Sequence, residues 1–187
     1  MKQIKEIINL LRETSGTNDK IGILKMNSEN ELLKNVLEYT YNPYKKYGVL
    51  PSISMAQAIL ESSWGQSELA SKYNNYYGIK ATSSWTGGVV NFSTQENYND
   101  TIKANFRVYN SLEESVNDLG QFLKNNSRYS ENGVFSANNY IEQANAIERA
   151  GYATTKDENG ELIYGDKLIN VIRENNLMIY DNMVLKQ

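Results

Sequence analysis

The sequence predicts an α+β fold that is mostly helical and contains one β-hairpin. Apolar residues recur every three or four positions through most of the chain, which is the spacing of a buried helix face. Residues 89–109 change to an alternation of apolar and polar side chains, the pattern of paired strands. With 187 residues and no internal repeat, the chain is long enough for one compact domain and a small accessory segment.

A helical N-terminal segment is predicted for residues 1–45, followed by the main domain over residues 46–187. Within the segment, a short amphipathic helix is expected over residues 2–12. A second helical pattern begins at Ile21 and is expected to end near Asn42-Pro43.

The main domain is expected to begin with a helix that is buried on one side. Pro51 suits its first turn, Ser52 is expected to cap it, and Gly65 is expected to end it. The predicted core-facing stripe consists of Ile53, Ala56, Ile59, Leu60 and Ser63.

The predicted hairpin has a turn near Asn99-Asp100. Before the turn, one strand face carries Val90, Phe92, Thr94, Glu96 and Tyr98. Three helices are expected after the hairpin: one that begins at a capping box of Ser111 and Glu114, one over 140–150, and one over 167–176.

The composition excludes several kinds of chemistry. The chain contains no cysteine and no histidine, so it has no disulfide, thiolate nucleophile, histidine relay or Cys/His zinc site. A calcium loop of the Asp-x-Asp-x-Asp type is also missing, and we expect no metal and no organic cofactor. Proton transfer is left to Asp, Glu, Tyr or Lys, and glycoside hydrolysis is the large reaction class that needs nothing more.

Charge and hydropathy bear on the partners of the protein. A net charge of −3 and a pI near 5.2 argue against nucleic-acid binding. No apolar run is long enough to insert into a membrane, and the N-terminus lacks the features of a secretory signal peptide. Fourteen tyrosines suit stacking on sugars, although half-buried packing explains most of them equally well.

Glu61 is the first candidate for a catalytic acid. It lies near the end of the predicted first helix of the main domain, where Gln57, Ala58 and Trp64 are its expected neighbours. An apolar wall beside a carboxyl group raises its pKa, which a general acid needs near neutral pH. The alternative is a glutamate that only solvates the helix surface.

The segment AILESSWG, residues 58–65, resembles the catalytic-glutamate motif of the glucosaminidase family of peptidoglycan hydrolases, whose members resemble mannosyl-glycoprotein endo-β-N-acetylglucosaminidases and flagellar muramidases. The resemblance covers roughly residues 45–180. It implies a lysozyme-like, two-lobed domain, the glycan strands of peptidoglycan as substrate, and Glu61 as the acid.

The same resemblance suggests a second carboxylate. Thr94-Gln95-Glu96 is similar to the family's Thr-x-Glu hairpin motif, whose glutamate positions or activates water. The alternatives are that Glu96 is an edge-strand charge that blocks sheet pairing, or that Asp100 takes the role.

Further site residues follow from the resemblance. The segment NYYGIK, residues 75–80, is similar to the family's Asn-x-Phe-Gly-Ile-Lys segment, and a loop packed under the helix is the alternative for it. Tyr152, in the sequence AGYAT, resembles the family's cleft tyrosine and is expected to be catalytic. Tyr164 resembles the tyrosine that precedes the family's last helix, although the Thr155–Glu161 connection before it is longer than the family's usual one. The residues expected to bind the substrate are Trp64, Asn75, Tyr77 and Tyr164.

We therefore predict an endo-β-N-acetylglucosaminidase that cleaves the β-1,4 bond on the reducing side of N-acetylglucosamine. Either Glu96 assists water, or the substrate's N-acetyl group is the nucleophile and a tyrosine stabilises the developing charge. The rival predictions are a lytic transglycosylase and a non-catalytic wall-binding module of a phage particle.

The setting is predicted to be a phage. Residues 20–43 are similar to the helical N-terminal stretch of phage ATP-dependent DNA ligases, but the chain has no Lys-x-Asp-Gly motif and ligase chemistry is not supported. We expect a monomeric endolysin that is made in the host cytoplasm and reaches the cell wall through a holin or within a virion.

Overall fold

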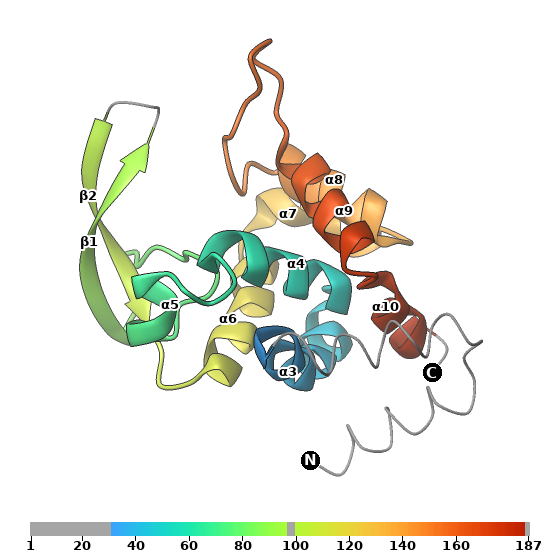
Figure 1. Ribbon diagram of the computed structural model, residues 1–187, viewed down its shortest axis with the longest axis horizontal. Helices are drawn as coiled ribbons and strands as arrows, with labels where there is room; N and C mark the ends of the chain where they lie inside the picture. The colour runs from blue at the N-terminus through green and yellow to red at the C-terminus, as the bar shows by residue number, and fades with distance from the viewer. Residues whose placement is uncertain (1–30, 97–99, 186–187) are drawn as a thin grey trace.

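The computed structural model describes residues 31–96 and 100–185. The predicted helix over 2–12, the beginning of the second helical pattern and the residues 97–99 of the hairpin turn lie outside the described residues. The elements in chain order are α3 (Glu31–Tyr47), α4 (Pro51–Ser62), α5 (Glu68–Tyr73), β1 (Gly88–Glu96), β2 (Asp100–Val108), α6 (Leu112–Asn125), α7 (Ser127–Glu131), the 3₁₀ helix η1 (Val134–Ser136), α8 (Tyr140–Arg149), α9 (Tyr164–Glu174) and α10 (Met178–Leu185). The predicted α+β class with one hairpin is confirmed, and Figure 1 shows the hairpin standing beside the helical body next to α5.

Helix α4 is the centre of the core. Ten of its twelve residues are buried, and it packs against α3, α8, α9 and α10. The helix ends at Ser62, earlier than the predicted stop, because Ser63, Trp64 and Gly65 all have left-handed backbone with φ of 49°, 61° and 79°. Ser63, which the predicted stripe includes, is exposed.

The N-terminus of α4 is held by a carboxylate from the other end of the chain. Asp181 of α10 is 4% exposed, and its Oδ1 and Oδ2 accept hydrogen bonds from the Ser52 N–H at 2.9 Å and the Ser52 Oγ at 2.6 Å. The predicted capping by Ser52 is therefore wrong: the N-cap residue is Leu50, and Ser52 donates to Asp181 instead.

Asp181 is expected to make the protein more stable at mildly acidic pH. Burial raises its pKa from 3.8 to about 6, against the opposing effect of the two Ser52 hydrogen bonds. A raised pKa means that the stabilisation is complete below about pH 4 and is lost as the pH rises through about 6, by up to about 2–3 kcal/mol. Asp181→Asn keeps an acceptor for the Ser52 N–H without the charge. Urea unfolding of both proteins at pH 4.5 and 7.5 should show the variant to be the more stable at pH 7.5 only, and an equal difference at both values would contradict the assignment.

Helix α3 does not end at Asn42-Pro43 as predicted but continues through the buried Pro43 to Tyr47. A Cβ at Gly120 of α6 would lie 2.5 Å from Tyr47 Cδ2 and 3.3 Å from Pro43 Cβ, so only glycine allows the two helices to approach this closely. This packing outweighs the backbone hydrogen bond that proline cannot make. The predicted boundary between residues 45 and 46 lies inside α3, whose Leu33 and Val36 are buried in the same core as α4.

The hairpin has the predicted alternation, with Val90 opposite Phe106 and Phe92 opposite Ala104. Asp100 pairs with Glu96 and is the first residue of β2, so the strands meet at the predicted place in the sequence. The Phe92 ring contacts Tyr73 of α5 edge-on at 5.8 Å, which attaches the hairpin to the helical body.

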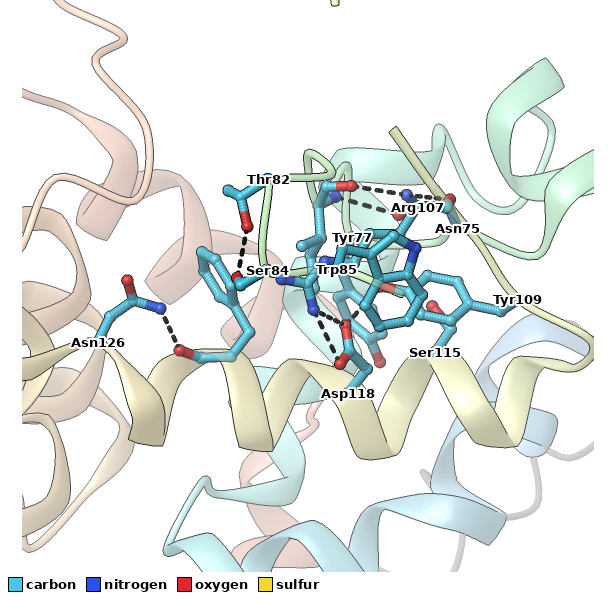
Figure 2. A network of polar contacts seen from close by, with 12 residues as sticks. Asn75, Tyr77, Thr82, Ser84, Trp85, Arg107, Tyr109, Ser115, Asp118 and Asn126 are labelled. Atoms are coloured by element: carbon cyan, nitrogen blue, oxygen red, sulfur yellow. Dashed lines mark hydrogen bonds and ion pairs between the residues drawn. The ribbon is translucent and has the colours of Figure 1, made fainter. Parts of the chain in front are cut away.

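A largely buried ion pair fixes the base of the hairpin (Figure 2). Arg107 of β2 makes two hydrogen bonds to the Asp118 carboxylate of α6 at 3.0 and 2.8 Å, and Tyr109 donates to the same carboxylate at 2.6 Å. The Arg107 guanidinium also lies over the Trp85 ring at 4.5 Å. One charged group thus joins β2, α6 and the loop that precedes β1.

The C-terminal helices match the sequence in part. Ser111 caps α6 as predicted, although the Glu114 carboxylate accepts from the Asn110 N–H. Helix α8 has the predicted extent, whereas α9 begins at Tyr164 and not at Lys167. The short helices α5, α7 and α10 were not predicted. No helix within the described residues is long and apolar enough to cross a membrane.

Candidate active site

Glu61 lies in the last turn of α4, against the first residue of α9. The Tyr164 hydroxyl donates to Glu61 Oε1 at 2.6 Å, and Tyr164 is 3% exposed. Gln57, one turn earlier on α4, donates from Nε2 to the same hydroxyl at 3.3 Å. The structure therefore joins Glu61 and Tyr164, which are 103 positions apart in the sequence.

The environment of Glu61 favours its protonated form. Burial raises the pKa of the carboxyl group above its ordinary value, while the Tyr164 hydrogen bond and the positive charge of Lys167 act in the opposite direction. Lys167, which the sequence interpretation did not include in the site, follows Tyr164 by one turn of α9. A carboxyl group with a raised pKa beside a fixed hydroxyl donor is suited to general acid catalysis.

Gly78 lies beside the second oxygen of Glu61. A Cβ at this position would be 3.7 Å from Glu61 Oε2, and the φ of +61° favours glycine. The predicted NYYGIK segment thus approaches Glu61 through its glycine backbone.

Asn75 and Tyr77, which are predicted to contact a sugar, are both buried in this structure. Asn75 is completely buried, and its amide binds the backbone of Ile79 in both directions and the Arg107 carbonyl. Tyr77 is 1% exposed. The Asn75 amide holds the loop that carries Gly78, which favours the alternative of a loop packed under the helix.

Of the two candidate tyrosines, Tyr164 and not Tyr152 makes the hydrogen bond to Glu61. Tyr152, predicted as the catalytic tyrosine, donates its hydroxyl to the Tyr77 carbonyl at 2.9 Å. Its ring stacks on Tyr164 with centroids 5.5 Å apart and planes 15° from parallel. It is Tyr164, predicted only to bind the substrate, whose hydroxyl contacts Glu61. Tyr152 thus packs against one face of the Tyr164 ring.

The long connection between these tyrosines forms a turn of its own. Asp157 Oδ1 accepts from the backbone N–H groups of Asn159 and Glu161, and Lys156 forms a β-bridge with Leu162. The additional residues are therefore accommodated in this turn, and Tyr164 still reaches Glu61.

Trp64 and Glu96 lie differently from the residues around Glu61. Because α4 ends at Ser62, Trp64 does not have the helical i+3 relation to Glu61 and is 39% exposed. Glu96 is the last residue of β1, and Figure 1 shows this end of the hairpin standing away from α4. Within the described ranges, no group of three or more acidic side chains is arranged to hold a metal ion.

Comparisons with known proteins identify the family of the chain. The family model of mannosyl-glycoprotein endo-β-N-acetylglucosaminidase matches residues 38–177. The exo-glucosaminidase LytG of Bacillus subtilis (strain 168) is 40% identical over 146 residues, which are 75% of this chain and 49% of LytG. The peptidoglycan hydrolase FlgJ of Salmonella typhimurium (strain LT2) is 38% identical over 134 residues, 68% of this chain and 40% of FlgJ. The chain thus spans half or less of these curated relatives.

Solved structures show the same similarity. The catalytic domain of the autolysin Auto from Listeria monocytogenes has a TM-score of 0.66 at 30% identity, covering 88% of this chain and 96% of that domain. A truncated glycoside hydrolase domain of Salmonella typhimurium FlgJ has a TM-score of 0.57 at 36% identity, covering 78% and 99%. The chain belongs to the glucosaminidase family, and the predicted lysozyme-like fold is confirmed.

Proposed function

We propose that the protein is a peptidoglycan hydrolase that cleaves the glycan strand with Glu61 as the general acid. The observation that carries the proposal is the contact between Glu61 and the Tyr164 hydroxyl at 2.6 Å. The activities in the names of LytG and FlgJ support the choice of substrate.

In this proposal each oxygen of Glu61 has its own task. Oε2, beside Gly78, gives its proton to the glycosidic oxygen as the bond breaks. Oε1 keeps the hydrogen bond from Tyr164, which stabilises the carboxylate that remains after proton transfer. Trp64, exposed beyond the end of α4, is proposed to contact the sugar.

Two routes complete the reaction. If Glu96 activates water, the free end of the hairpin must approach Glu61 when the glycan is bound. If the N-acetyl oxygen of the substrate is the nucleophile, no second carboxylate is required. Glu96→Gln separates the routes, because only the first predicts a loss of activity on the order of a hundredfold or more.

The proposed bond is the β-1,4 linkage on the reducing side of N-acetylglucosamine, cleaved in the endo mode. The proposal includes a monomeric enzyme that reaches the wall from the cytoplasm of a phage-infected cell, by a holin or in a virion. A lytic transglycosylase is the second candidate, since it needs a single glutamate such as Glu61.

The test is the loss of turbidity of purified Gram-positive cell walls, followed by mass spectrometry of the products. Lysis with N-acetylglucosamine at the new reducing ends and a range of fragment lengths is the expected result. Release of one small product from chain ends would mean exo cleavage, and anhydro-muramyl ends would mean a transglycosylase. Failure to degrade walls of several chemical types would leave a non-catalytic wall-binding module.

A further inference from the structure

Gln57 is a buried amide that the proposed reaction does not use directly. Its exposed fraction is 0%, and it lies one turn before Glu61 on α4. Nε2 donates to the Tyr164 hydroxyl at 3.3 Å, whereas Oε1 has no hydrogen-bond partner among the described residues. Burying an amide oxygen without a partner opposes folding, so packing alone is a poor account of this side chain.

The bond from Gln57 gives the Tyr164 hydroxyl a direction. An amide N–H can only donate, so the hydroxyl oxygen accepts from Gln57. The single hydroxyl proton is then directed to Glu61 Oε1, at the much shorter distance of 2.6 Å. Donation to a hydroxyl also polarises it and strengthens the hydrogen bond that it donates.

This direction determines where Glu61 carries its own proton. Oε1 already receives the Tyr164 proton, and the acceptor side of that hydroxyl is occupied by Gln57. The acidic proton of Glu61 is therefore on Oε2. This oxygen lies beside Gly78, which has no side chain to cover it. Without Gln57, the Tyr164 oxygen could accept the Glu61 proton and hold it away from the substrate.

We propose that Gln57 is a positioning residue that acts through Tyr164 and keeps the transferable proton of Glu61 on Oε2. The inference rests on the proposed function for its catalytic meaning, but the coupling of Gln57, Tyr164 and Glu61 is measurable without any substrate.

The experiment is an NMR titration of the Glu61 carboxyl carbon in ¹³C-glutamate-labelled protein, with Glu61→Gln to assign the signal. Gln57→Met removes the amide and keeps the length of the side chain, so the Tyr164 donor weakens and the pKa of Glu61 should rise, by about 0.3–0.7 pH units. Tyr164→Phe should raise it further. If the amide had the opposite orientation and accepted from Tyr164, Gln57→Met would release the hydroxyl to Glu61 and lower the pKa, so a fall or no change overturns the proposal.

Two comparisons separate the relay from general packing. In the Tyr164→Phe background, Gln57→Met should produce no further shift; a shift of undiminished size would mean a direct solvation effect and would also overturn the proposal. Ser54→Ala is the matched control, because Ser54 is equally buried on α4 and its Oγ also lacks a partner among the described residues. It should leave the titration of Glu61 unchanged.

Kinetics then connect the relay to the reaction. Gln57→Met should lower kcat about threefold to tenfold with KM unchanged, and should move the basic limb of the pH profile upward with the pKa of Glu61. A normal kcat in a variant with the shifted pKa would overturn the assignment of the proton to Oε2. If the wild-type protein cleaves no glycan but the NMR coupling is present, the proposed function fails and the relay stands.

Discussion

Glu61→Gln is expected to reduce glycan cleavage by about 10²–10⁴-fold without unfolding the protein. Glutamine retains an oxygen that can accept from the Tyr164 hydroxyl, as Oε1 does in the wild type. It has no acidic proton to give to the glycosidic oxygen. The measurement is the rate of release of reducing ends from purified peptidoglycan, and binding of the variant to the same material shows whether the site is still formed.

The same substitution should make the protein more stable at neutral pH. Burial raises the pKa of Glu61, so its stabilising contribution is present at acidic pH and is lost as the pH rises through the pKa of the folded protein. A neutral amide avoids that loss, and a melting temperature above that of the wild type at pH 7.5 but not at pH 4 is expected.

Glu68→Gln is the matched control for Glu61→Gln. Glu68 lies in α5, is exposed, and pairs with Lys72 at 2.8 Å, so its replacement should change neither activity nor stability by much. If Glu61→Gln retained more than about a tenth of the wild-type rate, another residue would have to be the acid.

The sequence predicted those parts of the fold that have a local cause. The alternation of Val90 and Phe92 specifies a strand whatever it packs against, and the capping of α6 by Ser111 depends on neighbouring residues only. The course of α3 through Pro43 was predicted wrongly because its cause is Gly120, on another helix. Likewise, the capping of α4 depends on Asp181, 129 positions from Ser52.

The candidate site also depends on contacts between residues that are far apart in the sequence, which local patterns do not predict. Glu61 was found from its motif, and Tyr164 was named although the family resemblance gave it only a binding role. No local pattern indicates that Tyr164 begins α9, because the apolar spacing of that helix starts later, at Leu168. Its contact with Glu61 arises from the packing of α4 against α9. The sequence also cannot show that the Asn75 amide is bound by the backbone of Ile79 and, across the fold, by the Arg107 carbonyl of β2.

Arg107→Ala is expected to be the most destabilising single change at the base of the hairpin, at about 3–5 kcal/mol. The side chains of Arg107 and Asp118 are 12% and 11% exposed, so removal of the guanidinium leaves a nearly buried carboxylate whose remaining hydrogen bond within the described residues comes from the Tyr109 hydroxyl. The Trp85 ring also loses the cation that lies over it at 4.5 Å. Denaturant unfolding of the wild type and the variant measures the difference in the free energy of unfolding.

Hydrogen exchange shows which parts of the protein lose stability in Arg107→Ala. It therefore tests whether the ion pair, in addition to the backbone hydrogen bonds of the hairpin, holds β2 against the helices. The Arg107 N–H donates to the Ile79 carbonyl and the Arg107 carbonyl accepts from Asn75, so β2 is bonded to the loop that carries Gly78 to Glu61. Hydrogen exchange in Arg107→Ala should therefore quicken at residues 79–81 and along β2 before the core of α4 opens. Asp118→Asn, which keeps the shape of the side chain, should cost less than Arg107→Ala, because the amide oxygen can still accept from Arg107 and the guanidinium keeps its place over the Trp85 ring. Exchange that quickens evenly throughout the protein would mean that the pair supports the core in general and does not specifically hold the loop beside Glu61.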